Sequence, residues 1–454
     1  MHNEIKNELS RDFSLPDLLK FTFPTVAMLI FVATYTIIDG MFVSRYVEEG
    51  TRALSAINIV FPLINVITGI GIMLGTGGSA IIGRRMGEGR NEDARSNFSL
   101  IIVFGVMISI LLSAISLIFI EPLSRFLGAD DLLLPYCMDY ARILIAFYPI
   151  SVVQIIFQTF FVTAGKPKLG LGLNLLSGLA NIFFDYLFIV VFDMGIAGAA
   201  WGTVCSFVIG GIPPLFYFAK PRGILYFVKP KWDGSVIGQT LINGSSEMVT
   251  SSAMAITTFL FNITMMRMMG EIGVAAITII LYAQFLFSSA YMGFSNGVAP
   301  IFSYTYGSRN STRMRKLFRM CLGTILVSSI VMLGVSYLCA VPTIAFFTPT
   351  DATTYNLTLE GYHIFAWNFL FAGINIFASS FFTALSNGLI SALLSFLRTF
   401  VLVTSCILIL PQVWGLNGIW LAIPVAEGLT VILATILLYL FRNKYQYAKP
   451  KQAA

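Results

Sequence analysis

The sequence predicts an all-α polytopic membrane protein, with twelve transmembrane helices in two parallel pseudo-symmetric six-helix bundles. Three observations support this fold class. The 454-residue chain is 57% hydrophobic and only 11% charged, whereas soluble chains carry roughly 25% charged residues. Twelve long apolar segments follow one another, and the two halves of the chain match at a constant spacing. This composition excludes a water-soluble enzyme, a nucleic-acid-binding protein and a disordered chain, because so apolar a chain needs lipid as its solvent.

Each apolar segment is long enough to cross a bilayer, which takes about 20 mostly apolar residues. The segments are continuously apolar and lack the alternation of a membrane β-barrel. A leader of mixed charge precedes the first segment, so we expect a retained span there and not a cleavable signal peptide. The expected spans are 21–43, 53–82, 98–120, 132–163, 170–192, 196–219, 237–268, 272–305, 317–340, 355–385, 389–411 and 415–441.

The basic residues sort to one side of these spans. With twelve spans, both termini lie on the same side, and 22 of the 28 Lys and Arg residues fall in the termini and loops of that side. Only Arg45, Arg52, Arg125 and Arg267 fall on the other. Cytoplasmic loops carry such an excess. We therefore expect a multi-pass protein of the cell membrane with both termini in the cytoplasm.

The second half of the chain repeats the first. When the chain is shifted so that Gly50 falls on Gly270, many other residues coincide. Other pairs at this offset are Gly77 and Gly297, Gly87 and Gly307, Arg95 and Arg315, Phe98 and Phe318, and Gly195 and Gly415. Because each repeat holds an even number of spans, the two halves are predicted to have the same orientation. We expect an N-terminal lobe at 1–216, a cytoplasmic linker at 217–235 and a C-terminal lobe at 236–454.

Acidic residues inside spans are functional candidates, since each costs about 2.5–3.5 kcal/mol to insert. Asp39 lies in the first expected span, four residues after Tyr35 and on the same helix face. Asn181 and Asp185 share a face of the fifth span, and Thr203 follows in the sixth. Carboxylate, amide and hydroxyl oxygens suit a small hard cation, and two neighbouring carboxylates also favour binding a proton. The set of Asp39, Asn181, Asp185 and Thr203 therefore predicts a site for Na⁺ or H⁺.

The repeat supports a dedicated role for this set, because the C-terminal half lacks it. The matching positions are Phe259, Val401, Ser405 and Ile423. Glu247 and Glu427 are weaker interior candidates, and we expect Glu427 to pair with Arg398 in a structural ion pair. The five cysteines are scattered and form no CxxC pair, which indicates neither a disulfide framework nor a zinc site. No catalytic motif is present, so the chain is not expected to be an enzyme.

The chain resembles the multidrug and toxic compound extrusion (MATE) family, in its prokaryotic MepA-like or DinF-like branches. The stretch from Ile38 to Arg45 is similar to the family's first-span Asp-x-x-x-Val pattern, with Pro24 fifteen residues before Asp39. The spacing of Asn181, Asp185 and Thr203 is similar to that of the family's N-lobe cation site. One departure is Asn375, which stands where one branch has a tenth-span carboxylate.

The resemblance implies a secondary active antiporter that exports lipophilic, often cationic organic compounds in exchange for Na⁺ or H⁺ by alternating access. It implies that Asp39, Asn181, Asp185 and Thr203 bind the cation. The implied substrate-cavity residues are Tyr35, Tyr140, Gln158 and Glu247. No cofactor beyond the coupling ion is implied. The expected partners are small organic molecules and membrane lipid, with no nucleic acid, and the protein is expected to work as a monomer.

Two alternatives stay open from the residues alone. A lipid-linked oligosaccharide flippase of related fold would line its cavity with several basic residues, whereas only Arg142 and Arg398 lie in the interior of expected spans, away from their ends. A channel usually gains its pore by symmetric assembly, whereas this chain is already a pseudo-dimer. Both alternatives are therefore ranked below the antiporter.

Overall fold

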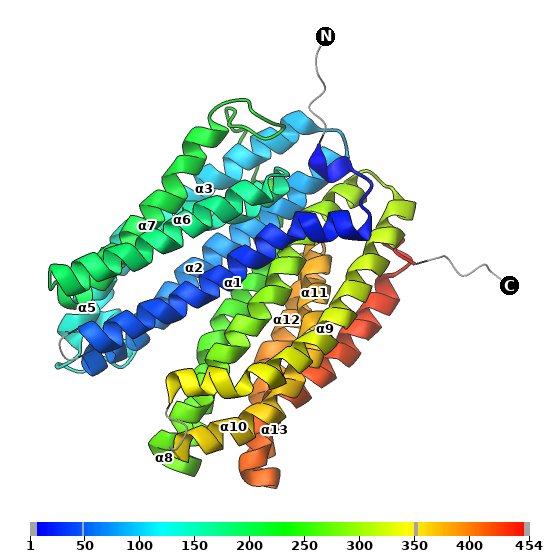
Figure 1. The fold of residues 1–454 in the computed structure, drawn as a ribbon. Helices are drawn as coiled ribbons and strands as arrows, with labels where there is room; N and C mark the ends of the chain where they lie inside the picture. Colours follow the sequence, from blue (N-terminus) through cyan, green and yellow to red (C-terminus); the bar gives the residue numbers. More distant parts are fainter. Residues whose placement is uncertain (1–6, 48–49, 349–352, 449–454) are drawn as a thin grey trace.

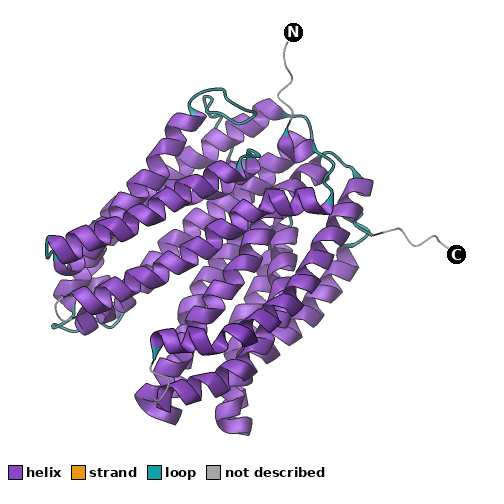
Figure 2. Ribbon diagram, in the orientation of Figure 1, coloured by secondary structure: helices purple, strands orange, loops and turns teal. Residues whose placement is uncertain are grey.

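The computed structural model describes residues 7–47, 50–348 and 353–448. Within these ranges nearly all residues are helical and no strand is present (Figure 2). The helices are η1 Glu8–Ser10, α1 Leu15–Tyr46, α2 Gly50–Gly87, α3 Asn91–Ile118, α4 Ile120–Phe126, α5 Leu134–Thr163, α6 Pro167–Asp185, η2 Tyr186–Val191, α7 Gly195–Phe218, α8 Gly234–Gly307, α9 Ser311–Phe347, α10 Thr353–Phe365, η3 Ala366–Asn368, α11 Phe369–Ala384, α12 Gly388–Phe396, η4 Leu397–Val403 and α13 Thr404–Phe441.

Ten helical segments of the described chain are long and apolar enough to cross a membrane, and two of them contain a pair of spans. The 74 residues of α8 would extend about 110 Å as one helix, far beyond a bilayer. Gly270 interrupts α8 with φ 64°, and Gly415 interrupts α13 with φ 56°. These left-handed conformations suit glycine, which has no Cβ. Each interruption separates two successive spans, so the twelve predicted transmembrane helices are confirmed.

The spans form two bundles that meet at one end and diverge toward the other (Figure 1). Helices α1 to α7 make the first bundle, and α8 to α13 make the second. Both η1 and the end of α13 lie at the end where the bundles meet, as an even number of spans requires. We call this the terminal end of the molecule.

The bundles meet mainly where α2 packs against both halves of α8. A Cβ on Gly77 would lie 2.0 Å from the carbonyl oxygen of Thr240. A Cβ on Gly87 would lie 2.1 Å from that of Tyr304, and one on Gly307 would lie 2.1 Å from that of Arg84. Only glycine allows backbones to approach this closely. Thr240 and Tyr304 lie far apart along α8 yet contact the same end of α2, which shows that α8 reverses at Gly270.

The predicted repeat is visible in the backbone. Three turns of the first bundle contain a residue with positive φ, and each has a counterpart with positive φ in the second bundle. The pairs are Gly89 and Arg309, Gly165 and Ser386, and Gly195 and Gly415. Each pair keeps the offset that separates Gly50 from Gly270, or exceeds it by a single position. This recurrence confirms the two pseudo-symmetric bundles.

The segments that leave the two bundles also pack alike. Arg95 donates from Nε to the carbonyl oxygen of Ile224, and Phe227 packs against Phe98 with ring centroids 5.3 Å apart. In the second bundle Arg315 donates from Nε to the carbonyl oxygen of Gln446, and Tyr447 packs against Phe318 at 4.5 Å. These equivalent contacts explain why Arg and Phe recur in the two halves of the sequence. The bounds of the lobes at 1–216 and 236–454 and of the linker at 217–235 stay a prediction; α7 ends at Phe218 and α8 begins at Gly234.

The contact between α2 and α8 predicts a cross-link between the bundles. A Cβ on Gly69 would lie 3.3 Å from the Cβ of Ser251, close to the roughly 3.5–4.5 Å of a disulfide. We expect Gly69→Cys with Ser251→Cys to oxidise readily. After cleavage at a protease site inserted between residues 219 and 233, the two halves should migrate together on a non-reducing gel.

The control pairs Gly172→Cys with Ser251→Cys, because a Cβ on Gly172 would have no neighbour within 4 Å. This control should separate into halves. Equal cross-linking of both pairs would contradict the described packing of α2 on α8.

Candidate functional site

Two aspartates from different helices of the first bundle meet in its interior. Asp39 lies on α1 and Asp185 is the last residue of α6, and their carboxyl groups are close enough to interact electrostatically. Two carboxyl groups that interact in a buried site repel each other when both are ionised, which favours binding of a proton or a cation. Asp39 Oδ1 and Asp185 Oδ2 are each buried without a hydrogen-bond partner. The pair therefore offers two buried acceptor oxygens that lack partners.

Asn181 and Gly202 complete the surroundings of Asp185. Asn181 donates from Nδ2 to Asp185 Oδ1 at 3.4 Å, and the two residues are buried, with exposures of 2% and 0%. A Cβ on Gly202 of α7 would lie 2.0 Å from Asp185 Oδ1. The glycine thus provides the space that the carboxyl group occupies. Sequence reasoning missed Gly202, because nothing local marks it among the glycines of α7.

The predicted tyrosines lie beside the aspartate pair. Tyr35 is one turn before Asp39, and its ring packs against Phe31 with centroids 5.7 Å apart. Tyr140 of α5 is only 6% exposed and interacts electrostatically with Asp39 and Asp185. Thr203 is the residue after Gly202 on α7, but no hydrogen bond joins its side chain to these groups in the described chain.

Gln158 lies elsewhere in the bundle. It is eighteen residues after Tyr140 on α5, which corresponds to about 27 Å along the helix. Its Nε2 donates to Asn174 Oδ1 at 2.7 Å. At the equivalent place in the second bundle, Ser379 contacts Ser395 at 3.1 Å. Both bundles thus have a polar contact between the same two helices at this place. The contact of Gln158 is therefore part of the framework that the two repeats share.

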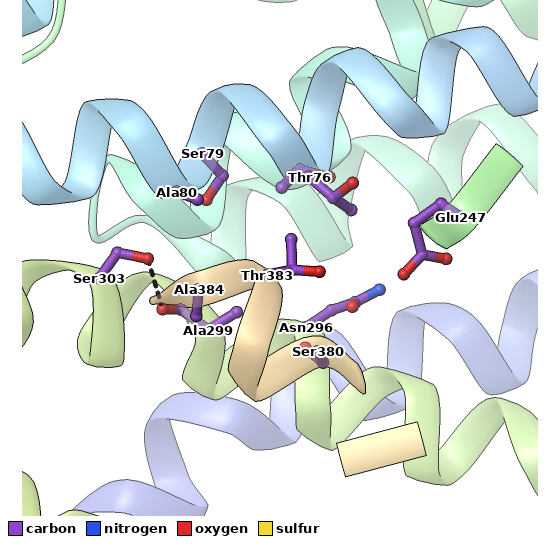
Figure 3. Close-up of a pocket in the computed structure, with 11 residues that line it drawn as sticks. Thr76, Ser79, Ala80, Glu247, Asn296, Ala299, Ser303, Ser380, Thr383 and Ala384 are labelled. Atoms are coloured by element: carbon purple, nitrogen blue, oxygen red, sulfur yellow. Dashed lines mark hydrogen bonds between the residues drawn. The ribbon is translucent and has the colours of Figure 1, made fainter. Parts of the chain in front are cut away.

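Glu247 lies outside the aspartate pair as well, in a polar cavity between the two bundles. Its carboxylate points toward Asn296 (Figure 3). The cavity is lined by hydroxyl, amide and small side chains of α2, α5, α8 and α11, namely Thr76, Ser79, Ala80, Thr159, Glu247, Asn296, Ala299, Ser303, Ser380, Thr383 and Ala384. Glu247 therefore faces the contact between the bundles and not the first bundle's interior.

The expected pairing of Glu427 with Arg398 is confirmed. Arg398 donates to Glu427 Oε1 at 2.6 Å, and Asn375 donates from Nδ2 to Glu427 Oε2 at 2.6 Å. In the first bundle, the positions equivalent to Asn375, Arg398 and Glu427 hold neutral side chains that also form hydrogen bonds. That network consists of Gln154, Ser177 and Ser206, in the same order. The same three helices are thus linked by ionised groups in one bundle and by neutral groups in the other.

The residues of the aspartate site suit a monovalent cation or a proton. Two carboxyl groups and an amide oxygen are hard ligands, and they lie inside a membrane-spanning bundle. The described residues contain no group of three or more His, Cys, Asp or Glu that could hold a metal ion. The arrangement is chemically an acidic site whose unpartnered oxygens can accept a small cation or a proton.

The fold and this acidic interior define a polytopic membrane transporter. The family model described as MatE matches residues 24–187 and 248–408, which is well over half of the chain. The chain therefore belongs to the MatE family. The matched ranges fall in the two bundles and leave out the connector between them.

Several relatives and structures are similar over nearly the whole chain. Multidrug export protein MepA from Staphylococcus saprophyticus is 22% identical, with 94% of each chain covered. An outward-facing structure of a multidrug resistance MATE family transporter of the MOP superfamily aligns with a TM-score of 0.91 at 19% identity, covering 99% of this chain and 100% of that one. A MOP superfamily transporter from Pyrococcus furiosus aligns with a TM-score of 0.89 at 20% identity and the same coverage. These structures establish the shared fold.

The close approach of Gly202 to Asp185 predicts a steric effect. Gly202→Ala should displace the Asp185 carboxyl group and lower the free energy of unfolding by about 1–3 kcal/mol, as overpacking does. Thermal unfolding in detergent monitors this loss. Gly172→Ala on the neighbouring α6 is the matched control, because it has open space and gains helix propensity. A Gly202→Ala protein as stable as the control would contradict the packing.

The buried ion pair predicts a non-additive effect. Arg398→Met leaves Glu427, 3% exposed, without its cation. The loss should reach about 3–5 kcal/mol, whereas an apolar replacement of both partners costs much less. We expect the double variant Arg398→Met with Glu427→Leu to melt above the single variant. If the double variant melts lower, the pair stabilises the fold more than its desolvation costs, contrary to this expectation.

Proposed function

We propose that this transporter exports lipophilic, cationic organic compounds in exchange for Na⁺ or H⁺. The buried pair of Asp39 and Asp185 carries the proposal, because it offers buried acceptor oxygens that lack partners. Asn181 and Thr203 complete the proposed cation site. The export of drugs is inferred from the relatives named MepA. Tyr35, Tyr140 and Glu247 are proposed to line the substrate path, and Gln158 only at its terminal end.

The first helix is suited to connect ion binding with movement of the bundles. Asp39 lies in its second half among α6 and α7, while Pro24 lies in its first half. There α1 packs on the second bundle, because a Cβ on Gly293 would lie 2.5 Å from the Cα of Val26. Proline removes a helical hydrogen bond and weakens the helix at that point. One helix thus joins the acidic site to the opposite bundle through a bendable segment.

These contacts support an alternating-access cycle. Ion uptake changes the electrostatic interaction between Asp39 and Asp185, which alters the conformation of α1 and its packing on α8. The bundles, closed at the terminal end, then separate there and close at the other. Linkage requires that compound and ion weaken each other's binding by the same factor. We propose that the terminal end is cytoplasmic, in agreement with the 22 basic residues that the sequence assigns to one side of the membrane, and that the protein acts as a monomer in the cell membrane.

The experiment is efflux of a fluorescent lipophilic cation from proteoliposomes, with Na⁺ and pH gradients imposed separately. The wild-type protein should respond to at least one gradient. Asp39→Asn and Asp185→Asn should reduce ion-driven efflux to the level of protein-free liposomes. Each amide keeps nearly the shape of the acid but can neither bind a proton nor supply the negative charge that a cation needs.

Asp131→Asn is the matched control, because its carboxylate is 91% exposed and pairs with Arg125 on the surface. It should leave efflux unchanged. Gradient-driven efflux that persists in both site variants would refute the assignment of the ion site. A wild-type protein that conducts single-channel currents would refute the carrier mechanism itself.

A further inference from the structure

A second cavity lies far from the aspartate pair, at the terminal end of the first bundle. It is a groove of about 460 Å³ lined by residues of α5, α6 and α7 and the segment after α7. The lining residues are Phe161, Leu169, Leu173, Pro213, Phe216, Tyr217, Ala219, Lys220 and Arg222. Its volume lies within the roughly 300–1,000 Å³ of small-ligand sites. No established or proposed step of transport uses it.

The groove combines an apolar wall with a positive rim. Leu169 is 43% exposed and Phe216 is 71% exposed, so both face the lipid side of the bundle. Lys220 and Arg222 follow the end of α7 and are exposed. Arg222 lies over the ring of Tyr217 at 5.5 Å, and Lys220 forms no ion pair within the described chain. None of the lining residues is acidic, so the positive charge is not neutralised within the groove.

The groove sits at the depth where lipid headgroups begin. Helix α6 starts at Pro167 and α7 ends at Phe218, and Lys166 and Lys168 flank the start of α6. Basic pockets between spans at this level bind anionic headgroups. An amphipathic ligand could place its charged part at the rim and its chain between α6 and α7.

The second bundle serves as an internal comparison, because the side chains at two equivalent positions are buried there. The repeat relates Leu173 to Leu394 and Phe216 to Leu437. Leu394 is 0% exposed and Leu437 is 9% exposed. Phe441 packs against Phe382 at 5.7 Å and fills the equivalent region. The exposure of Phe216 is therefore a property of the first bundle and not a general feature of six packed helices.

We infer that the groove binds one anionic phospholipid, with its phosphate at Lys220 and Arg222 and an acyl chain along Leu169, Leu173 and Phe216. The apolar wall explains the acyl chain, and the unpaired cations explain the preference for an anionic headgroup. The exposed position of Phe216 allows exchange with the surrounding leaflet. The site needs no particular coupling ion or transported compound, so it stands apart from the proposed function.

Native mass spectrometry of the full chain tests this site, with phosphatidylglycerol and phosphatidylcholine supplied in equal amounts. The wild-type protein should retain phosphatidylglycerol in preference to phosphatidylcholine. Lys220→Gln with Arg222→Gln should lower the retained phosphatidylglycerol on the order of tenfold, since each basic residue near the surface attracts anionic lipid. Leu173→Trp keeps both charges but fills the groove, and it should lower retention as well.

The matched control is Arg442→Gln with Lys444→Gln, which removes two cations after the last helix of the second bundle, where the groove is filled. It should retain phosphatidylglycerol like the wild type. Thermal unfolding checks that every variant is folded. Three outcomes would each overturn the site: unchanged retention in Lys220→Gln with Arg222→Gln, an equal loss in the control pair, or unchanged retention in Leu173→Trp.

Discussion

The close packing of α1 and α2 on α8 is the constraint on which the rest of this structure depends. In lipid, apolar side chains gain little by associating, so helices join where small residues let backbones approach. Gly77 and Gly87 on α2, and Gly293 and Gly307 on α8, provide these contacts. They hold the two bundles together at the terminal end and leave them apart at the other. Gly293 also packs against α1, so the helix that carries Asp39 contacts both bundles.

The two bundles share a framework and differ where chemistry is expected. Three features recur in both copies: turns with positive φ, the packing of the segment that follows the last helix, and a polar network that links three helices. In the first bundle this network joins α5, α6 and α7. The link is neutral at Gln154 and Ser177 but ionised at Arg398 and Glu427. The acidic pair of Asp39 and Asp185 has no counterpart. Duplication therefore explains the architecture, while the differences between the copies locate the groups proposed to act.

Much of the fold was predictable, because burial in lipid imposes strong patterns on the chain. Segment length and the distribution of basic residues predict the spans. The contact of Asn181 with Asp185 follows from helical spacing alone, and the pairing of Glu427 with Arg398 follows from the cost of an isolated charge in a membrane. The separation of Gln158 from the aspartates could also be predicted, because Gln158 and Tyr140 lie far apart along one helix, α5. The proposed roles of Asp39, Asn181, Asp185 and Thr203 stay predictions.

By itself, the sequence determined that this chain spans a membrane twelve times, repeats once and carries carboxyl groups within its spans. Those features are local, because they depend on hydropathy and spacing along one helix. Tertiary structure alone decided that Asp39 reaches Asp185 from another helix and that Gly202 leaves room for the carboxyl group. It also decided that the groove beside Phe216 is open while its counterpart is filled. These contacts depend on the rotation and separation of neighbouring helices, which are set by the combined packing of many side chains.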